Sequence, residues 1–281
     1  MFRVGRGVEI KSPAQILKMR RAGLVVADAL AATVAEVRPG VTTAELDAVA
    51  ADSIARAGAV PSFLGYGAVD GQGGFPGVTC ISVNSEIVHG IPGPQVLAEG
   101  DLVSIDCGAI LAGWHGDSAV TVIVGSASAQ AYELSEATRL ALWHGIAAAR
   151  LDGHVTDISA AVERYVRSLQ YRYGIVAEYV GHGIGTAMHQ PPDVPNLGRP
   201  GRGPRIVEGL ALAVEPMLTL GSADNTLLDD DWTVVTDDGQ LACHWEHTMT
   251  VTASGVWVLT AQDGGEQMLG ELGVSFGPLA D

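Results

Sequence analysis

The chain has 281 residues, of which 47% are hydrophobic, and this is enough for a globular protein with a substantial core. Its formal net charge of −16 argues against a general nucleic-acid binder, which needs a basic surface. Three scattered cysteines (Cys80, Cys107 and Cys243) provide neither a disulfide framework nor a CxxC zinc pattern, and they favour a reducing cytoplasm. No signal peptide, membrane span or linker is visible, so we expect one domain over residues 1–281 with a short N-terminal segment, residues 1–11.

The first part of the chain predicts two helices followed by strands. Ser12 is an N-cap with proline at the first helical position and glutamine three residues after the cap, and this helix runs toward Val37. A second helix begins at Thr42 and ends near Gly58, and a glycine-rich loop follows over Gly65–Gly77. The expected strands are Val78–Val83, Ile87–His89, Asp101–Ile110 and Ser118–Val124.

The same order then repeats. Helical segments at Ala131–Arg150 and Ile158–Tyr173 precede a second β block. Its expected strands are Ile175–Val180, Leu210–Leu218, Trp232–Thr236, Leu241–Thr252 and Val256–Thr260. Residues 190–208 are rich in proline and glycine and predict a surface loop. Two similar α+β halves would place a site at the seam between them.

The stretch DLVSIDCGAILAGWHGD, residues 101–117, carries the aspartates Asp106 and Asp117 in its interior and at its end. Asp106 sits in an apolar run, where a carboxylate is costly unless it is compensated, and Asp117 follows eleven positions later. Gly113 offers a turn between two strand arms, so the stretch predicts a hairpin or two adjacent strands. Two carboxylates brought together repel unless a cation lies between them, which indicates half of a metal site.

The second half supplies two further acids in strands that otherwise look like core. Glu215 ends the apolar run ALAV, and Glu246 alternates with His244 and Thr248 on one face of another strand. Any one of the four acids is more often a salt-bridge partner or a strand-end surface residue. Four acids in like contexts, two per half and with few basic residues nearby, favour a site for two divalent cations. An oxygen-rich site of this kind suits Mn, Fe or Co better than a thiolate zinc site.

Histidine adds to these acids. His182 is expected in a loop, in GHGIG, where alternating glycines exclude a helix and allow close backbone approach, and His189 follows seven residues on. A lone histidine is more often structural, and His89, in a turn after a short strand, is nondescript by itself. Two metals held about 3.5–4 Å apart would lower the pKa of a bridging water toward ~7. The reaction class indicated is metal-assisted hydrolysis, for example of an amide.

With these residues assembled, the chain resembles a type I methionine aminopeptidase from about Ser12 to Thr260. The resemblance is carried by VNSEIVHGIP, IDCGAILAGWHGD, GHGIGTAMH, VEPM, WTVVT and WEHT, in this order. It implies the α+β (mixed α/β) pseudo-twofold pita-bread fold, with an antiparallel sheet flanked by helices and the metal site at its centre. It also implies removal of the initiator methionine from nascent proteins and peptides when the second residue is small.

The resemblance also implies roles for residues of this sequence. The five metal ligands would be Asp106, Asp117, His182, Glu215 and Glu246, holding two divalent ions (Co, Mn, Fe or Zn). Asp117 and Glu246 would bridge both ions. His189 would stabilise the developing oxyanion, His89 would contact the scissile nitrogen, and Glu215 would manage the proton of the attacking water. The methionine pocket would be lined by Tyr66, Phe75, Cys80, Met188 and Trp232.

Some positions depart from the family pattern. Met188 stands where phenylalanine is common and implies a reshaped pocket, and His244 stands where glutamine is common. Val69–Gly74 resembles an insertion in the loop that carries Tyr66 and Phe75. Ser104 and Ala242 replace residues often tied to a monovalent cation, so that ion is not predicted.

Two rival functions remain open. One is a Xaa-Pro aminopeptidase or dipeptidase of the same fold, which would usually carry an N-terminal domain before the metal domain. The other is a non-catalytic binding module that kept the fold. For the aminopeptidase we expect a monomer in the cytoplasm that acts on N-terminal peptides of nascent chains. It would contact the ribosome exit region transiently, without direct nucleic-acid specificity and without a membrane.

Overall fold

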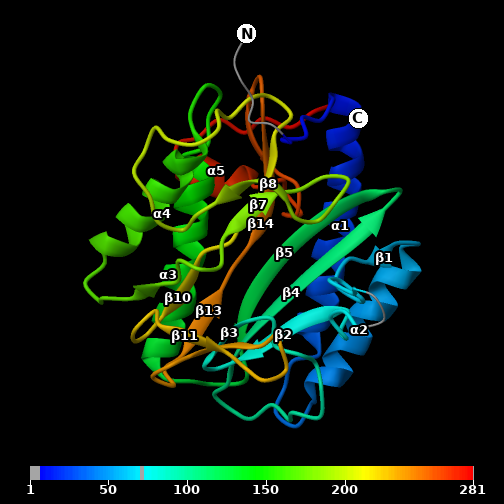
Figure 1. The fold of residues 1–281 in the computed structure, drawn as a ribbon, viewed down its shortest axis with the longest axis vertical. Coiled ribbons are helices and arrows are strands. Elements are labelled where there is room, and N and C mark those ends of the chain that lie inside the picture. Colours follow the sequence, from blue (N-terminus) through cyan, green and yellow to red (C-terminus); the bar gives the residue numbers. More distant parts are fainter. Residues whose placement is uncertain (1–6, 70–72, 281) are drawn as a thin grey trace.

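The computed structural model describes residues 7–69 and 73–280, in which the predicted helices and strands occur in the predicted order (Figure 1). Several short strands and a short C-terminal helix occur in addition. The first half contains α1 (Pro13–Ala35), α2 (Thr43–Arg56), β1 (Val60–Pro61), β2 (Thr79–Val83), β3 (Glu86–Val88), β4 (Leu102–Leu111) and β5 (Trp114–Ile123). The second half begins with α3 (Ala129–Ala147), α4 (Val155–Ser168), β6 (Gly174–Ile175), β7 (Gly181–Gly183) and β8 (Gln190–Val194). It continues with β9 (Ala211–Val214), β10 (Met217–Thr219), β11 (Asn225–Leu227), β12 (Val234–Thr236), β13 (Ala242–His244), β14 (His247–Thr252), β15 (Gly255–Val258) and α5 (Glu266–Glu271).

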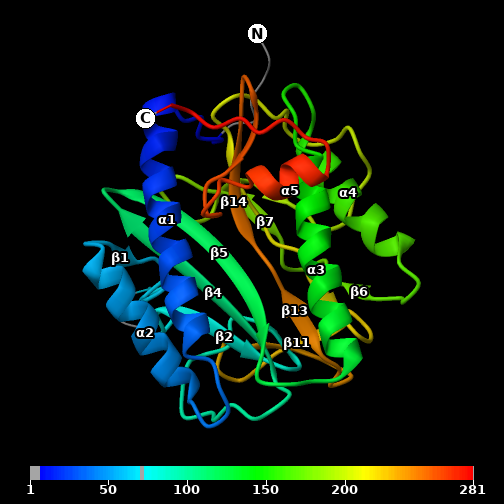
Figure 2. The same cartoon turned by 180° about the vertical axis from the view of Figure 1, so that it is seen from behind.

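Helix starts follow the predicted capping chemistry. The backbone N–H of Ser12 donates to Gln15 Oε1 at 2.8 Å, and that of Thr42 donates to Glu45 Oε2 at 2.8 Å. Each bond satisfies a backbone donor at the start of a helix. Figure 2 shows α1 across the outer face of β4 and β5 with α2 beside it, while α3 and α4 cover the other half. The inner faces of the two halves therefore meet around the centre of the molecule.

The β4–β5 hairpin places the two aspartates together as predicted. Asp106 pairs with Ala119, and Asp117 pairs with Gly108, so the two carboxylates are diagonal neighbours on one face of the hairpin. The chain reverses at Ala112 and Gly113, whose φ angles are 50° and 80°. Positive φ at both central residues is the geometry of a two-residue hairpin turn that matches strand twist.

Hydrogen bonds between β5 and the start of β14 join the two halves. The N–H of Glu246 donates to the carbonyl oxygen of Ala119 at 3.0 Å, and Thr248 Oγ1 donates to the carbonyl oxygen of Asp117 at 2.8 Å. On its other side β14 pairs with β9, and β9 pairs with β7. Residues far apart in the sequence are thus fixed beside the hairpin.

Two predicted strands are interrupted at their glutamates. The strand expected over Leu210–Leu218 is divided into β9 and β10 at Glu215 and Pro216, and the one expected over Leu241–Thr252 is divided into β13 and β14 at Trp245 and Glu246. In both places the break leaves a glutamate, Glu215 or Glu246, outside the strand pairing at the seam between the two halves. Simple alternation along a continuous strand therefore describes neither glutamate.

The prediction was wrong for residues near the second-half sheet edge. Residues 190–208 include β8, which forms the edge of a five-stranded sheet where the prolines at 191 and 192 are tolerated. His182 lies in β7 and not in a loop. A Cβ added at Gly181 or Gly183 would lie 2.3 Å from a neighbouring backbone oxygen, so the predicted close approach is present. The strand expected at Ile175–Val180 is reduced to β6.

In residues 7–69 and 73–280, no helix has both the length and the apolarity needed to cross a membrane. The cysteines named above are buried and unbonded to one another.

Candidate metal centre and adjoining pocket

One cavity of about 140 Å³ lies at the seam, and every predicted site residue lines it. They are Tyr66, Phe75, Cys80, His89, Asp106, Asp117, His182, Met188, His189, Glu215, Trp232 and Glu246. The prediction missed Phe63, which also lines the cavity. A Cβ at Gly108 would lie 2.9 Å from Phe63 Cε1, so this glycine admits the ring, and only the three-dimensional approach reveals it. The structure therefore gathers the predicted residues, while their individual roles remain predictions.

The acidic end of the cavity has the composition of a metal site. One ligand atom from each of Asp117, His182 and Glu246 lies within 4.8 Å of the others. His182 Nε2 lies 3.7 Å from Asp117 Oδ2 and 3.5 Å from Glu215 Oε1. Asp106 joins them from the neighbouring strand position on β4. The four carboxyl groups and one imidazole come from five different parts of the chain.

These acids lack the partners that buried carboxylates need. Asp106 Oδ1, Asp117 Oδ1 and Glu246 Oε1 are buried without a hydrogen-bond partner, and the residues lining the cavity include no lysine or arginine. Burial raises the pKa of Asp106 from 3.8 to about 7. Burial, and then the neighbouring acids, raise the pKa values of Asp117, Glu215 and Glu246 well above their usual range. A cluster this costly to ionise fits cations as its missing partner.

His182 has the tautomer of a metal ligand. Its Nδ1 lies 3.0 Å from the carbonyl oxygen of Gly183, which only accepts, so Nδ1 carries the proton. The Nε2 lone pair then faces Asp117 and Glu215, two acceptors to which it cannot hydrogen bond when they are ionised. Burial lowers the pKa of His182 to about 3 and keeps the ring neutral. An imidazole whose other nitrogen is held by a backbone carbonyl is the usual arrangement of a metal-ligating histidine.

His244 is a further buried group at the same place. Its Nε2 is 3.8 Å from Glu215 Oε2 and has no hydrogen-bond partner, and the residue is 2% exposed. Glu215 thus lies between the Nε2 atoms of His182 and His244. The strand alternation that linked His244 to Glu246 did not indicate this contact with Glu215.

The cavity also has an apolar lining. Phe63, Phe75, Cys80 and Met188 form one buried cluster, with Trp232 packed against it. The Phe75 ring meets Trp232 edge to face with centroids 5.2 Å apart. Met188, which stands where the resemblance led us to expect a larger ring, is 5% exposed within this cluster. The suggested insertion Val69–Gly74 includes residues 70–72, which lie outside the described residues.

Two further histidines, His89 and His189, line the same cavity. His89 has φ of 60°, which turns the chain after β3, and burial lowers the pKa of its imidazole to about 4. The centroids of the His189 and His182 rings are 4.3 Å apart, and His189 Nδ1 is 2.6 Å from the Tyr66 hydroxyl oxygen. Burial also lowers the pKa of His189. Both rings are therefore neutral at pH 7 and present one donor and one acceptor each.

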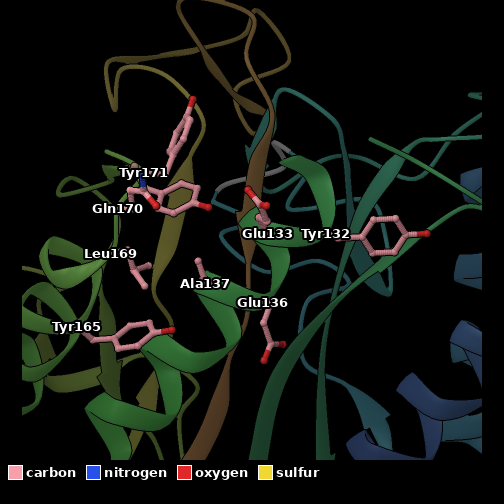
Figure 3. A pocket seen from close by; sticks show the side chains of 9 residues that line it. Tyr132, Glu133, Glu136, Ala137, Tyr165, Leu169, Gln170 and Tyr171 are labelled. Carbon is pink, nitrogen blue, oxygen red and sulfur yellow. The ribbon is translucent and has the colours of Figure 1, made fainter. Parts of the chain in front are cut away.

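A larger hollow of about 690 Å³ lies between α3 and the end of α4 (Figure 3). Tyrosines and two glutamates line it, among them Tyr132, Glu133, Glu136 and Tyr171. Arg139 pairs with Glu136 at 2.8 Å. None of the predicted site residues lies there, so size alone does not identify the candidate site.

Comparison with known proteins agrees with this geometry. The model of metallopeptidase family M24 matches residues 17–253. The chain belongs to metallopeptidase family M24. Among M24 relatives, "Methionine aminopeptidase 1" of Mycobacterium tuberculosis is 50% identical over 260 residues, which cover 91% of this chain and 96% of that protein.

Solved structures of M24 proteins give the same result. The crystal structure of methionine aminopeptidase from Rickettsia prowazekii has a TM-score of 0.86 and 36% identity, covering 90% of this chain and all of that one. Prolidase from Pyrococcus furiosus has a TM-score of 0.70 at 21% identity, covering 90% of this chain and 65% of that one, which shows the fold alone. The resemblance and the pita-bread fold predicted from the sequence motifs are confirmed.

Proposed function

We propose that this M24 chain is a methionyl aminopeptidase that removes the N-terminal methionine from peptides and nascent proteins whose second residue is small. The observation that carries the proposal is the single cavity, lined both by four carboxyl groups with His182 and by the apolar cluster of Phe63, Phe75, Cys80 and Met188. Such a cavity fits a substrate with a flexible apolar side chain beside a hydrolytic centre.

Two divalent ions, of Co, Mn, Fe or Zn, would be held by Asp106, Asp117, His182, Glu215 and Glu246. Four carboxylates balance the formal charge of two such ions, and three of their buried oxygens have no other partner. When bound, the ions supply a water of lowered pKa and an electrophilic contact for the carbonyl. Oxygen-rich ligation favours hard or borderline metals over a thiolate zinc site.

The chain's own residues would then divide the remaining work. Glu215 takes the proton of the attacking water and returns it to the amine that leaves when the amide bond breaks. His189 donates a hydrogen bond to the carbonyl oxygen as negative charge develops there. His89 contacts the scissile nitrogen. The apolar cluster holds the methionine side chain and keeps water away from it.

The Xaa-Pro peptidases of the same fold are the second candidate. The chain is 36% identical to the Rickettsia prowazekii aminopeptidase but 21% identical to the Pyrococcus furiosus prolidase, which favours the aminopeptidase. We further propose one catalytic domain that works as a monomer in the cytoplasm, transiently near the ribosome exit. The net charge of −16 supports a partner contact without direct nucleic-acid recognition.

The experiment is amino-acid release from Met-Ala-Ser, Met-Phe-Ser and Ala-Pro peptides, with each metal added to chelator-treated protein. We expect free methionine from Met-Ala-Ser, little from Met-Phe-Ser, and no cleavage of Ala-Pro. Preferential cleavage of Ala-Pro would support the second candidate. Metal binding without release from any peptide would support a non-catalytic module. Glu246→Gln keeps the shape of the side chain and serves as the inactive control.

A further inference from the structure

The Tyr66 side chain lies at the cavity but outside its apolar cluster. The residue is 41% exposed, whereas Phe75 in the same loop is 2% exposed. The buried cluster contains Phe63 and Phe75 but not Tyr66. The Tyr66 hydroxyl oxygen is instead 2.6 Å from Nδ1 of His189, and the centroids of the Tyr66 and His189 rings are 5.0 Å apart. The Tyr66 hydroxyl therefore hydrogen bonds to a histidine, and the Tyr66 ring is not part of the buried apolar cluster.

Backbone hydrogen bonds fix Tyr66 in this place. Its N–H donates to the carbonyl oxygen of Phe63 at 2.8 Å, and its own carbonyl oxygen accepts from the N–H of Phe75 at 2.8 Å. Next to it, a Cβ on Gly67 would lie 3.1 Å from the Trp232 ring, so the chain packs closely on the pocket wall. The Tyr66 backbone is thus held by the backbone of two residues whose rings line the pocket, and its hydroxyl has a defined position.

The hydrogen bond determines which nitrogen of His189 carries the proton. A neutral imidazole has one donor and one acceptor nitrogen, and the bond at one decides the state of the other. In the described part of the chain, neither the His189 ring nor the Tyr66 hydroxyl has a second hydrogen bond. If the phenol donates, its proton has Nδ1 as an acceptor, and the ring proton of His189 is carried by Nε2. If Nδ1 donated instead, the phenol proton would have no acceptor among these residues.

We propose that Tyr66 is a positioning residue that holds His189 in the tautomer protonated at Nε2, so that this nitrogen is a hydrogen-bond donor toward the substrate carbonyl. The consequence for catalysis rests on the proposed function, but the tautomer itself does not. With the other tautomer, a lone pair on Nε2 would face the developing oxyanion and repel it. Tyr66 thus acts through His189 and not through contact with the methionine side chain.

The test compares Tyr66→Phe with the wild type and with Tyr132→Phe, which removes an exposed hydroxyl beside the α3–α4 hollow (Figure 3). The primary readout is two-bond proton–nitrogen NMR of the histidine rings in metal-free protein, with the His189 signals assigned by their loss in His189→Ala. We expect His189 to be protonated at Nε2 in the wild type and in Tyr132→Phe. In Tyr66→Phe we expect a mixture of tautomers. A wild-type ring protonated at Nδ1, or an unchanged tautomer in Tyr66→Phe, would overturn the proposal.

Kinetics with Met-Ala-Ser provide the second readout. Loss of one ordinary hydrogen bond predicts about a fivefold to tenfold lower kcat in Tyr66→Phe, with KM within about twofold of the wild type. A raised KM with unchanged kcat would assign Tyr66 to substrate binding and would refute a positioning role. Because the NMR measurement needs no turnover, failure of the proposed peptidase activity would leave the tautomer result intact. An active enzyme with an unchanged tautomer would refute this inference alone.

Discussion

Replacing Asp106 with asparagine should stabilise the metal-free protein while it removes a metal ligand. The Asp106 carboxyl is buried, its Oδ1 has no partner, and its pKa is raised from 3.8 to about 7. Because the folded state holds this proton more tightly than the unfolded state does, the free energy of unfolding falls as pH rises from about 4 to about 7. It stays level above that window. Asparagine has no proton to lose, so its advantage grows over the same window.

The rise of the Asp106 pKa from 3.8 to about 7 is roughly a thousandfold gain in proton affinity. At about 1.4 kcal/mol for each factor of ten, Asp106→Asn should raise the free energy of unfolding at pH 8 by at most about 4 kcal/mol. For a chain of this size, that corresponds to a rise in Tm on the order of 10 °C. The assay is thermal unfolding of chelator-treated wild type and Asp106→Asn between pH 5 and pH 8. Asp229→Asn, on the exposed loop after β11, changes net charge equally and is the control.

Saturating metal should reverse the order of stability. Metal binds the folded wild type and stabilises it by about 4 kcal/mol at a thousandfold excess over Kd, whereas the variant has lost one ligand. If metal-free Asp106→Asn were no more stable than the wild type at pH 8, the carboxyl would not be an uncompensated buried acid. The same would follow if Asp229→Asn reproduced the effect. Either result would refute the reasoning that assigns cations to this cluster.

Three further outcomes are expected. Glu246→Ala should abolish peptide hydrolysis and leave a folded protein by circular dichroism, and turnover at saturating metal would contradict its role as a shared ligand. Met188→Ala should raise KM for Met-Ala-Ser roughly tenfold by removing apolar contact, and an unchanged KM in initial-rate assays would place the methionine side chain elsewhere. Metal affinity measured by calorimetry should fall from pH 8 to pH 6 with proton release, because the raised pKa values of Asp106 and its neighbours make protons compete with metal. A pH-independent affinity would exclude these ligands.

The acids of the site could be predicted because a carboxylate within an apolar run is costly to bury without a partner. Asp106 and Glu215 follow apolar runs, where a carboxylate needs compensation, and the turn residue Gly113 shows how Asp106 and Asp117 meet. The helix starts at Ser12 and Thr42 were equally visible, because capping is local chemistry. These features depend on short stretches of sequence and on the cost of burying charge.

Other features depend on contacts between distant segments. Phe63 reaches the pocket because Gly108 leaves room for its ring, and no pattern in either segment indicates this approach. The prolines of β8 concealed an edge strand whose place is set by β7. Tyr66 could be assigned to the pocket by resemblance, but its hydrogen bond to His189 depends on the position of another loop. Sequence periodicity describes single helices and strands and does not predict contacts between loops that are distant in the sequence.

The central claim is that five side chains from distant parts of the chain hold two divalent ions that make peptide hydrolysis possible. The most direct measurement is a titration of chelator-treated protein with Mn²⁺ or Co²⁺, following bound metal and methionine release from Met-Ala-Ser in the same samples. The account predicts binding that saturates at two ions per chain, with activity that is absent without metal and appears as these sites fill. Full activity in the metal-free protein, or saturated metal binding that is unchanged in Glu246→Ala, would contradict it.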